Sequence, residues 1–234
     1  MINATDIFDA FLKKNDLISI ALHEESDVRI IAAFIKAELP ATILGDLRDF
    51  IQDVKTPLAV RSSSLLEDAL YQPFAGIYAT KMIPNHQAST DDRFLSLANA
   101  IKFVYASTFF QGAKSYIEST NHRTEEEKMA VVIQEVVGAR HGNTFYPDFS
   151  GVARSYNFYP VAGAKPEDGV VNVALGLGKA IVDGGVSLRF TPSIPHILPQ
   201  FGTTDDTLNN SQREFYAINM HPSTSTAFTD EDQY

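Results

Sequence analysis

The sequence predicts a mixed α/β fold, with helices in the first quarter of the chain and mostly strands after it. Across the first 55 residues, apolar side chains recur three or four positions apart, which is the spacing of a helix with one buried face. From Pro57 onward, short apolar runs alternate with turn-forming residues, a pattern typical of strands. Hydrophobic residues make up 44% of the 234 residues, enough for a sizeable core in one large domain or two small ones.

Three helices are expected before Pro57. The first follows Thr5 or Asp6 and the second follows Ser26, because short oxygen-bearing side chains cap helix N-termini. The third begins near Pro40, since proline is favoured in the first turn of a helix. The side chains expected to face the core are Ile7, Phe8, Phe11, Leu12, Ile30, Ile31, Phe34, Ile35, Ile43, Leu44, Leu47, Phe50 and Ile51.

Strands are expected at residues 58–60, 77–83, 129–137, 151–157, 170–175 and 186–190. One long helix interrupts this series and follows Ser89 or Thr90. The connections between strands are expected at residues 62–76, 139–149 and 160–169. Beyond Pro192 the pattern dissolves, and we expect a surface excursion that ends, at residues 223–234, in no recognisable element.

The charged segment 121–128 is expected to link two parts of the fold. We therefore predict a first domain at residues 1–125 and a second at 126–205. Residues 206–234 would form an irregular C-terminal tail.

Composition excludes several classes of protein. The net charge of −10, from 19 basic and 29 acidic residues, opposes binding to nucleic acids and anionic membranes. The chain has no cysteine, which excludes disulfides, zinc–thiolate sites and cysteine nucleophiles. No signal peptide and no apolar run of about 20 residues is visible. We expect a cytoplasmic, soluble protein, and the sequence does not set its oligomeric state.

The first stretch that could carry chemistry surrounds Arg61, at the end of an apolar strand. A strand holds the planar guanidinium rigidly, and its N–H groups suit phosphate oxygens. The hydroxyl of Ser62 and the backbone near Gly76 could complete an anion-binding hollow. The plainer interpretation is a strand that runs into a polar turn.

Two further stretches have the same two interpretations. The apolar run at 129–137, broken by Gln134 and Glu135, suits either a core strand or a strand edge that borders a purine. Gly176-Leu177-Gly178, followed by a short helix, has the order of a nucleotide-binding turn, but it lacks the third glycine of the dinucleotide fingerprint. The sequence contains no Walker A motif, no Gly-x-Ser-x-Gly elbow and no paired histidines of a metalloprotease.

Four ordered motifs together resemble the phosphoenolpyruvate synthase and pyruvate, phosphate dikinase family, over residues 57–184. The first motif is similar to the family pattern V-R-S-S-x-x-x-E-D followed by F-A-G and a threonine. The matching residues are Val60-Arg61-Ser62-Ser63, Glu67-Asp68, Phe74-Ala75-Gly76 and Thr80; then Val132-Ile133-Gln134 with Val136-Val137; then Ser150-Gly151-Val152; and finally Gly176-Leu177-Gly178 with Val182 and Gly184.

The resemblance implies an ATP-grasp-like nucleotide-binding domain that uses ATP and Mg²⁺. It implies that Arg61 touches the ATP phosphates, that the loop through Phe74, Ala75 and Gly76 folds over them, and that Ser62 and Thr80 also bind the nucleotide. It also implies that Gln134, Glu135, Val136 and Val137 border the adenine. In this family, ATP phosphorylates a histidine on a separate domain, which passes the phosphoryl group to pyruvate.

Departures from the family pattern indicate a fragment of a longer phosphotransferase. The first 55 residues lack the family motif G-G-K-G-A-N, and no match is found after Phe190, where the acidic metal-binding pair is expected. The phosphohistidine and pyruvate-binding domains are absent, so no catalytic residue is assigned and metal ligands stay unknown. A related dikinase acting on a glucan or an antibiotic, a non-catalytic nucleotide-binding module and a purely structural domain remain as alternatives.

Overall fold

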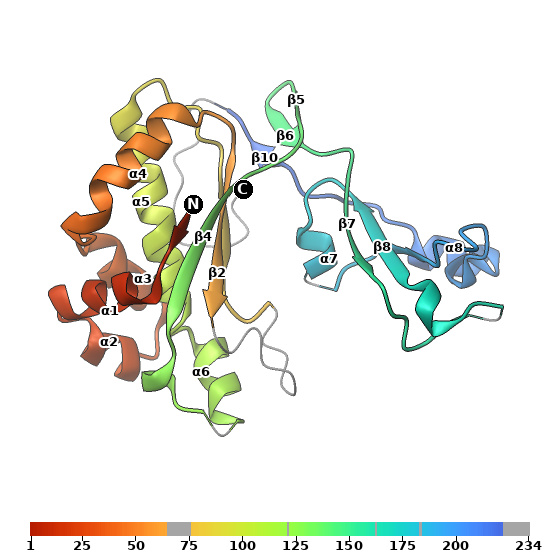
Figure 1. Cartoon of the computed structure of the whole chain (residues 1–234), viewed down its shortest axis with the longest axis horizontal. Coiled ribbons are helices and arrows are strands. Elements are labelled where there is room, and N and C mark those ends of the chain that lie inside the picture. The colour runs from red at the N-terminus through yellow and green to blue at the C-terminus, as the bar shows by residue number, and fades with distance from the viewer. Residues whose placement is uncertain (65–75, 121, 162, 183, 222–234) are drawn as a thin grey trace. The chain divides into compact units, whose positions relative to one another are not determined.

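The computed structural model describes residues 1–64, 76–120, 122–161, 163–182 and 184–221. The chain divides into two compact units. The first comprises Met1–Val136 together with the residues from Ile218, and the second comprises Val137–Ala217 (Figure 1). Helices combined with small antiparallel sheets confirm the mixed α/β class. The ATP-grasp architecture and the domain limits at residues 125 and 205 stay predictions.

The predicted N-terminal helices are present in the first unit. Buried residues such as Phe8, Phe34 and Leu47 lie on the expected faces. An additional short helix, α2, was not predicted, because Ala21 is its only buried side chain and it has no apolar period. The helices of this unit are α1 (Thr5–Lys14), α2 (Ile18–His23), α3 (Asp27–Lys36), α4 (Ala41–Asp53), α5 (Thr90–Ser107) and α6 (Gln111–Glu118), with a 3-10 turn at Thr124–Glu126. No helix in the described ranges is long and apolar enough to cross a membrane.

A four-stranded sheet, in the order β1-β4-β2-β3, is formed by β1 (Ile2–Asn3), β2 (Leu58–Ser64), β3 (Thr80–Ile83) and β4 (Met129–Glu135). All neighbouring strands are antiparallel. The predicted turn at Ser62 is wrong, because residues 62–64 continue β2 and pair with β4. The limits of two other strands also differ from the prediction: β3 begins at Thr80 rather than residue 77, and β4 ends at Glu135 rather than residue 137.

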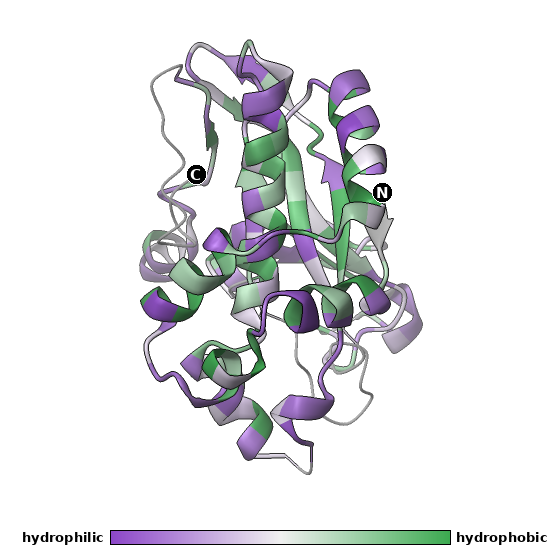
Figure 2. Ribbon diagram, turned by 90° about the vertical axis from the view of Figure 1, so that its left-hand side faces the viewer, coloured by the Kyte–Doolittle hydropathy of each residue, from purple (hydrophilic) through white to green (hydrophobic). Residues whose placement is uncertain are grey.

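Helices cover one face of this sheet (Figure 1). Helices α5 and α1 pack directly on the strands, while α3 and α4 pack on α5. The rings of Phe8, Phe11, Phe34 and Tyr105 meet between these helices, with centroids 5.0 Å apart for Phe8 and Tyr105 and 5.7 Å apart for Phe11 and Phe34. Figure 2 shows this helical side, with hydrophobic segments on the strands behind the helices. Full burial of each large apolar side chain contributes about 1.5–3 kcal/mol.

Two buried lysines form hydrogen bonds between helices of the first unit. Lys102 on α5 donates a hydrogen bond from Nζ to the carbonyl of Ile35 near the end of α3, at 3.1 Å. Lys114 on α6 donates to the carbonyl of Glu24, just after α2, at 2.8 Å. Cations at helix C-termini satisfy carbonyls that lack a partner within the helix. Burial lowers the pKa of both lysines, since it penalises the charged form.

The second unit contains the hairpin β5 (Ala139–His141) and β6 (Thr144–Tyr146), and an antiparallel sheet of β7 (Phe149–Arg154), β8 (Val170–Leu175) and β9 (Leu188–Phe190). Strand β8 has the predicted limits. The prediction that residues 139–149 only connect two strands is wrong, because β5 and β6 form a hairpin there that turns at Gly142, whose φ of +63° favours glycine. Strand β7 begins and ends earlier than predicted, and β9 is shorter. The unit also contains 3-10 turns at Pro166–Asp168 and Pro199–Phe201 and the helix α7 (Lys179–Val182).

Regular elements follow Pro192 within the stretch that was expected to be a surface excursion. Helix α8 (Thr204–Asn210) is capped by Thr203, whose hydroxyl accepts the backbone N–H of Asp206 at 3.1 Å. A two-residue strand, β10 (Ile218–Asn219), follows. The predicted structureless segment from residue 223 lies outside the described residues.

Candidate functional site

Arg61 lies in the middle of the sheet of the first unit. Its register partners are Thr80 in β3 and Val132 in β4. Residues directly opposite one another in antiparallel strands place their side chains on the same face. The sheet therefore brings Arg61 and Thr80 together, as the family motif implies, although they lie 19 positions apart in the sequence.

The Arg61 face is the one that the helices of this unit leave uncovered. The neighbouring positions Val60, Lys81 and Ile133 are buried, and they point to the helical side because side chains alternate along a strand. Arg61 itself is exposed, and Thr80 and Val132 are half-buried. A cationic side chain in the middle of this face can contact a ligand that binds on the uncovered side of the sheet.

Gln134 supports the Arg61 side chain. Arg61 Nη1 donates a hydrogen bond to Gln134 Oε1 at 3.4 Å, which is long for a hydrogen bond. Gln134 is paired with Ala59, two residues before Arg61, so both side chains lie on the uncovered face. Arg61, predicted to bind phosphate, and Gln134, predicted to border the adenine, are thus neighbours on the same face of the sheet.

Ser62 lies on the other face. It follows Arg61 directly in β2, so its side chain points toward the helices, where it is half-buried. Ser63, which the sequence analysis did not select, shares the Arg61 face and is paired with Ala130. The period-two alternation within β2 was the sequence signal that could have separated the two serines.

The end of β4 presents backbone groups at the edge of the sheet. Ile133 exchanges two hydrogen bonds with Met1 on the β1 side, at 2.8 and 2.9 Å. Because these groups alternate between the two sides of a strand, the N–H and C=O of Glu135 point toward the same edge, just past Met1. Val136 points the other way and donates its N–H to the carbonyl of Pro57 at 2.8 Å. Val137 follows as an exposed residue at the start of the second unit.

Part of the predicted site lies outside the described residues. This holds for Phe74 and Ala75 of the predicted phosphate loop, and for Glu67 and Asp68. Gly76 is described: it is exposed, and its φ of +80° lies in the left-handed region that favours glycine.

The Gly-Leu-Gly turn is closed by protein rather than open to a ligand. Gly176 has φ +75°, and a Cβ built there would lie 2.6 Å from the Phe215 ring and 2.7 Å from the Tyr216 carbonyl oxygen. Leu177 donates its backbone N–H to that same carbonyl at 2.9 Å. Glycine at position 176 therefore permits the close approach of residues 215–216, which is a packing role.

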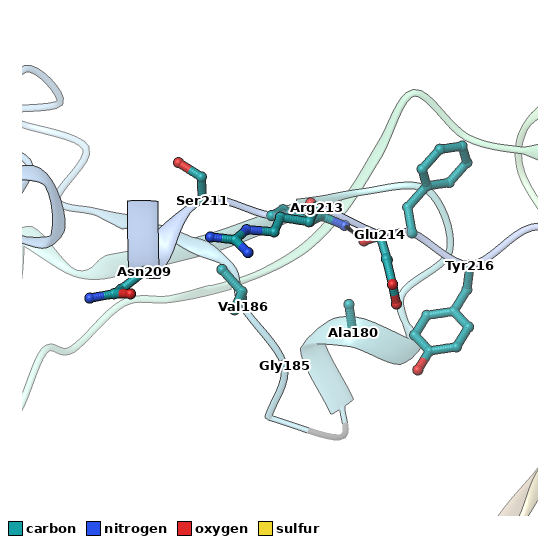
Figure 3. Close-up of a pocket in the computed structure, with 10 residues that line it drawn as sticks. Ala180, Gly185, Val186, Asn209, Ser211, Arg213, Glu214 and Tyr216 are labelled. Atoms are coloured by element: carbon teal, nitrogen blue, oxygen red, sulfur yellow. Dashed lines mark hydrogen bonds between the residues drawn. The ribbon is translucent and has the colours of Figure 1, made fainter. Parts of the chain in front are cut away.

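The second unit contains a cavity of about 680 Å³ beside this turn. Figure 3 shows Arg213 and Asn209 toward one end of the cavity and Glu214 and Tyr216 toward the other. Arg213 donates a hydrogen bond to the Leu208 carbonyl at 2.8 Å. The cavity is lined by Ala180, Gly185, Val186, Asn209, Ser211, Gln212, Arg213, Glu214, Phe215 and Tyr216. Its lining comes largely from the segment beyond Pro192, where the sequence analysis expected a surface excursion.

Metal ligands are not identified in the described part of the chain. No group of three or more His, Asp or Glu side chains there could hold a metal ion. The use of Mg²⁺ stays a prediction.

Comparison with known proteins places these features in a family. The family described as "Pyruvate phosphate dikinase, AMP/ATP-binding domain" matches residues 3–231. This match includes the N-terminal helices and the residues after Phe190, so the expectation that the similarity ends there is wrong.

Two curated relatives are similar to the chain. One is the "Uncharacterized phosphotransferase YvkC" of Bacillus subtilis, 28% identical over 183 residues, which cover 78% of this chain and 20% of that protein. The other is the "Phosphoenolpyruvate synthase" of Aeropyrum pernix, 28% identical over 173 residues, which cover 70% of this chain and 19% of that protein. The chain thus spans about a fifth of the length of these relatives.

Proposed function

The chain belongs to the family of pyruvate phosphate dikinase AMP/ATP-binding domains, and we propose that it binds ATP on the Arg61 face of its first sheet. Family membership and the names of both relatives identify an ATP-binding, phosphotransferase-type module. The relatives are about five times as long as the matched part, so the module would serve a larger protein.

The observation that carries this proposal is the position of Arg61. Its guanidinium sits on the uncovered face of the central strand, opposite Thr80 and beside Gln134. We assign Arg61 to the phosphates of ATP, because a planar guanidinium binds phosphate oxygens with two parallel hydrogen bonds. Thr80 would contribute its hydroxyl to the same phosphates, and the segment with Phe74, Ala75 and Gly76 would cover them.

Ser62 stays in the proposed phosphate-binding region, but its proposed role differs from that of Arg61 and Thr80. Its side chain points to the helical face, so its contribution would come from the backbone of β2 rather than from its hydroxyl. Ser63, on the Arg61 face, offers a hydroxyl in the corresponding place.

The adenine would lie along residues 134–137. The carbonyl of Glu135 points to the strand edge and can accept a hydrogen bond from the adenine amine. Val136 and Val137 would border the base, and the N–H of Val137 would supply a donor, since that of Val136 is donated to Pro57. Small and apolar side chains on the same face, Ala59 and Val132, suit the flat surface of a purine.

The parent reaction would be that of a phosphoenolpyruvate synthase or pyruvate, phosphate dikinase type of enzyme. ATP would phosphorylate a histidine on another domain of the longer protein, which would pass the phosphoryl group to pyruvate. The part of this chain would be to fix the phosphates and the base, since phosphoryl transfer depends mainly on positioning and charge stabilisation. We therefore expect no sustained ATP turnover by this chain alone.

Calorimetric titration with ATP tests the assignment. We expect Arg61→Ala to weaken ATP binding by at least tenfold, and Arg61→Lys to restore only part of it because it keeps the charge but not the planar fork. Arg29→Ala is the matched control, since Arg29 is an exposed arginine on α3 of the same unit. Equal ATP affinity of Arg61→Ala and Arg29→Ala would contradict the assignment of Arg61. Sustained ATP hydrolysis by the unmodified chain would contradict the expectation that this chain alone does not turn ATP over.

A further inference from the structure

The segment between α4 and β2 holds the strand end that we assign to the adenine. Two hydrogen bonds connect them: Thr56 Oγ1 donates to Glu135 Oε2 at 2.6 Å, and the Pro57 carbonyl accepts the N–H of Val136 at 2.8 Å. The first is short for its type and has a carboxylate acceptor, as expected of a charge-assisted hydrogen bond. Both are made across 79 residues of sequence, so neither is a local turn contact.

This segment is itself anchored. The buried side chain of Asn85 donates two hydrogen bonds from Nδ2, to the carbonyls of Val54 and Thr56, each at 2.9 Å. Arg93 on α5, also buried, donates from Nη1 to the same Val54 carbonyl at 3.4 Å. Asn85 has φ +49°, a conformation that asparagine tolerates better than most residues. The backbone that carries Thr56 is therefore fixed from the helical side of the unit.

The strand end needs this support. Residues 134 and 135 are the only exposed positions of β4, and no strand continues past Glu135. The carbonyl of Glu135 points to the β1 edge, so its direction depends on how residues 135 and 136 are held from the β2 side. The hydrogen bonds from Thr56 to Glu135 and from Val136 to Pro57 fix these two residues from the β2 side.

We propose that Thr56 is a positioning residue for base recognition: through Glu135 it sets the direction of the backbone carbonyl that reads the adenine amine. This inference rests on the proposed ATP site. Thr56 itself touches no part of the nucleotide. It acts on one end of the ligand, because the Arg61 phosphate position lies three residues along β2 from Leu58, the register partner of Glu135.

The ratio of ATP to inosine triphosphate affinity tests this role. Inosine triphosphate has the same ribose and phosphates but an oxygen in place of the adenine amine, so the two ligands differ at the atom that the Glu135 carbonyl would read. A merely structural defect would weaken both nucleotides equally, whereas misdirection of one carbonyl weakens ATP selectively.

The experiment is a set of calorimetric titrations of ATP, inosine triphosphate and inorganic tripolyphosphate into the 234-residue chain. We expect Thr56→Val to weaken ATP binding about three- to tenfold and to leave inosine triphosphate and tripolyphosphate within about twofold of the unmodified chain. Thr56→Ser, which keeps the hydroxyl, should retain the preference for ATP. Thr42→Val, an exposed threonine on α4, is the matched control.

A second variant keeps the inference open to refutation if Thr56→Val does not fold. Glu135→Ala removes the acceptor of the same hydrogen bond, and the pair Thr56→Val with Glu135→Ala should lose no more ATP preference than either single change. An unchanged ATP preference in Thr56→Val, or an equal loss for all three ligands, would overturn the inference. If Arg61→Ala still weakened ATP binding at least tenfold, the proposed ATP site would stand without it. An unmodified chain that binds neither nucleotide would overturn the proposed function and this inference with it.

Discussion

Substitution of Gly176 by alanine separates a packing role of the Gly-Leu-Gly turn from a nucleotide-binding role. The added Cβ would lie 2.6 Å from the Phe215 ring and 2.7 Å from the Tyr216 carbonyl oxygen, where real Cβ atoms are not found. The left-handed conformation costs an alanine about 1–2 kcal/mol. Displacement of the packed segment costs about 1–3 kcal/mol more. We expect a loss of about 2–5 kcal/mol in the free energy of unfolding.

Gly142→Ala is the matched control for this change. Gly142 has φ +63° in the same unit, and a Cβ there would meet nothing within 4 Å. It should therefore lose only the conformational part, about 1–2 kcal/mol. Urea unfolding followed by circular dichroism measures both, since the chain has no tryptophan to report by fluorescence.

Comparison of Gly176→Ala with Gly142→Ala can refute the packing interpretation. If Gly176→Ala and Gly142→Ala lose the same stability while only Gly176→Ala weakens ATP binding, then the turn serves the ligand. If Gly176→Ala costs more stability by about 1–3 kcal/mol, residues 215–216 explain the glycine.

Two further predictions concern stability. Burial lowers the pKa of Lys102 below its usual 10.5, so just below that pH the unfolded chain binds more protons than the folded chain, and stability rises with pH there. Lys102→Met, which also removes the hydrogen bond to Ile35, should flatten this rise in urea titrations up to about pH 10.5. An unchanged pH slope would contradict this prediction. The buried Asn157 Oδ1 accepts the N–H of Tyr159 at 3.1 Å and Nη2 of Arg189 at 3.0 Å. Asn157→Ala should therefore lower the free energy of unfolding by about 1–3 kcal/mol in thermal or urea unfolding. A loss below about 0.5 kcal/mol would show that the hydrogen bonds to Tyr159 and Arg189 do not stabilise this unit.

Local patterns explain what could be predicted from the sequence. Helix α5 has its cap at Ser89, whose hydroxyl accepts the N–H of Asp91 and Asp92, and a long run of buried residues follows. Both signals lie within one stretch of chain. Strand β8 was predicted with its observed limits for the same reason, since Gly169 and Gly176 bound a short apolar run.

Elements without a buried face were missed. Helix α8 has no buried residue, so it has no apolar period, although Thr203 and Asp206 at its start form a capping box that the sequence displays. The segment at residues 212–216 was also missed, because its order depends on contacts far along the chain. Gln212, for example, exchanges hydrogen bonds with both backbone groups of Leu175, at 2.7 and 3.1 Å.

The candidate site was predicted by residue type but not by geometry. Arg61, Thr80 and Gln134 were selected from the motifs, and the sheet register then placed them on one face. Register depends on pairing between strands about 70 residues apart, which no single window of sequence contains. The anchoring of Thr56 by Asn85 was invisible for the same reason.

Hydrogen–deuterium exchange of the 234-residue chain, with and without saturating ATP, tests the location of the site most directly. The account predicts slower exchange in β2, in β3 and at residues 134–137, with α3 and α4 unchanged. Protection confined to residues 179–216, or no protection anywhere despite measurable ATP binding, would contradict the assignment of ATP to the Arg61 face.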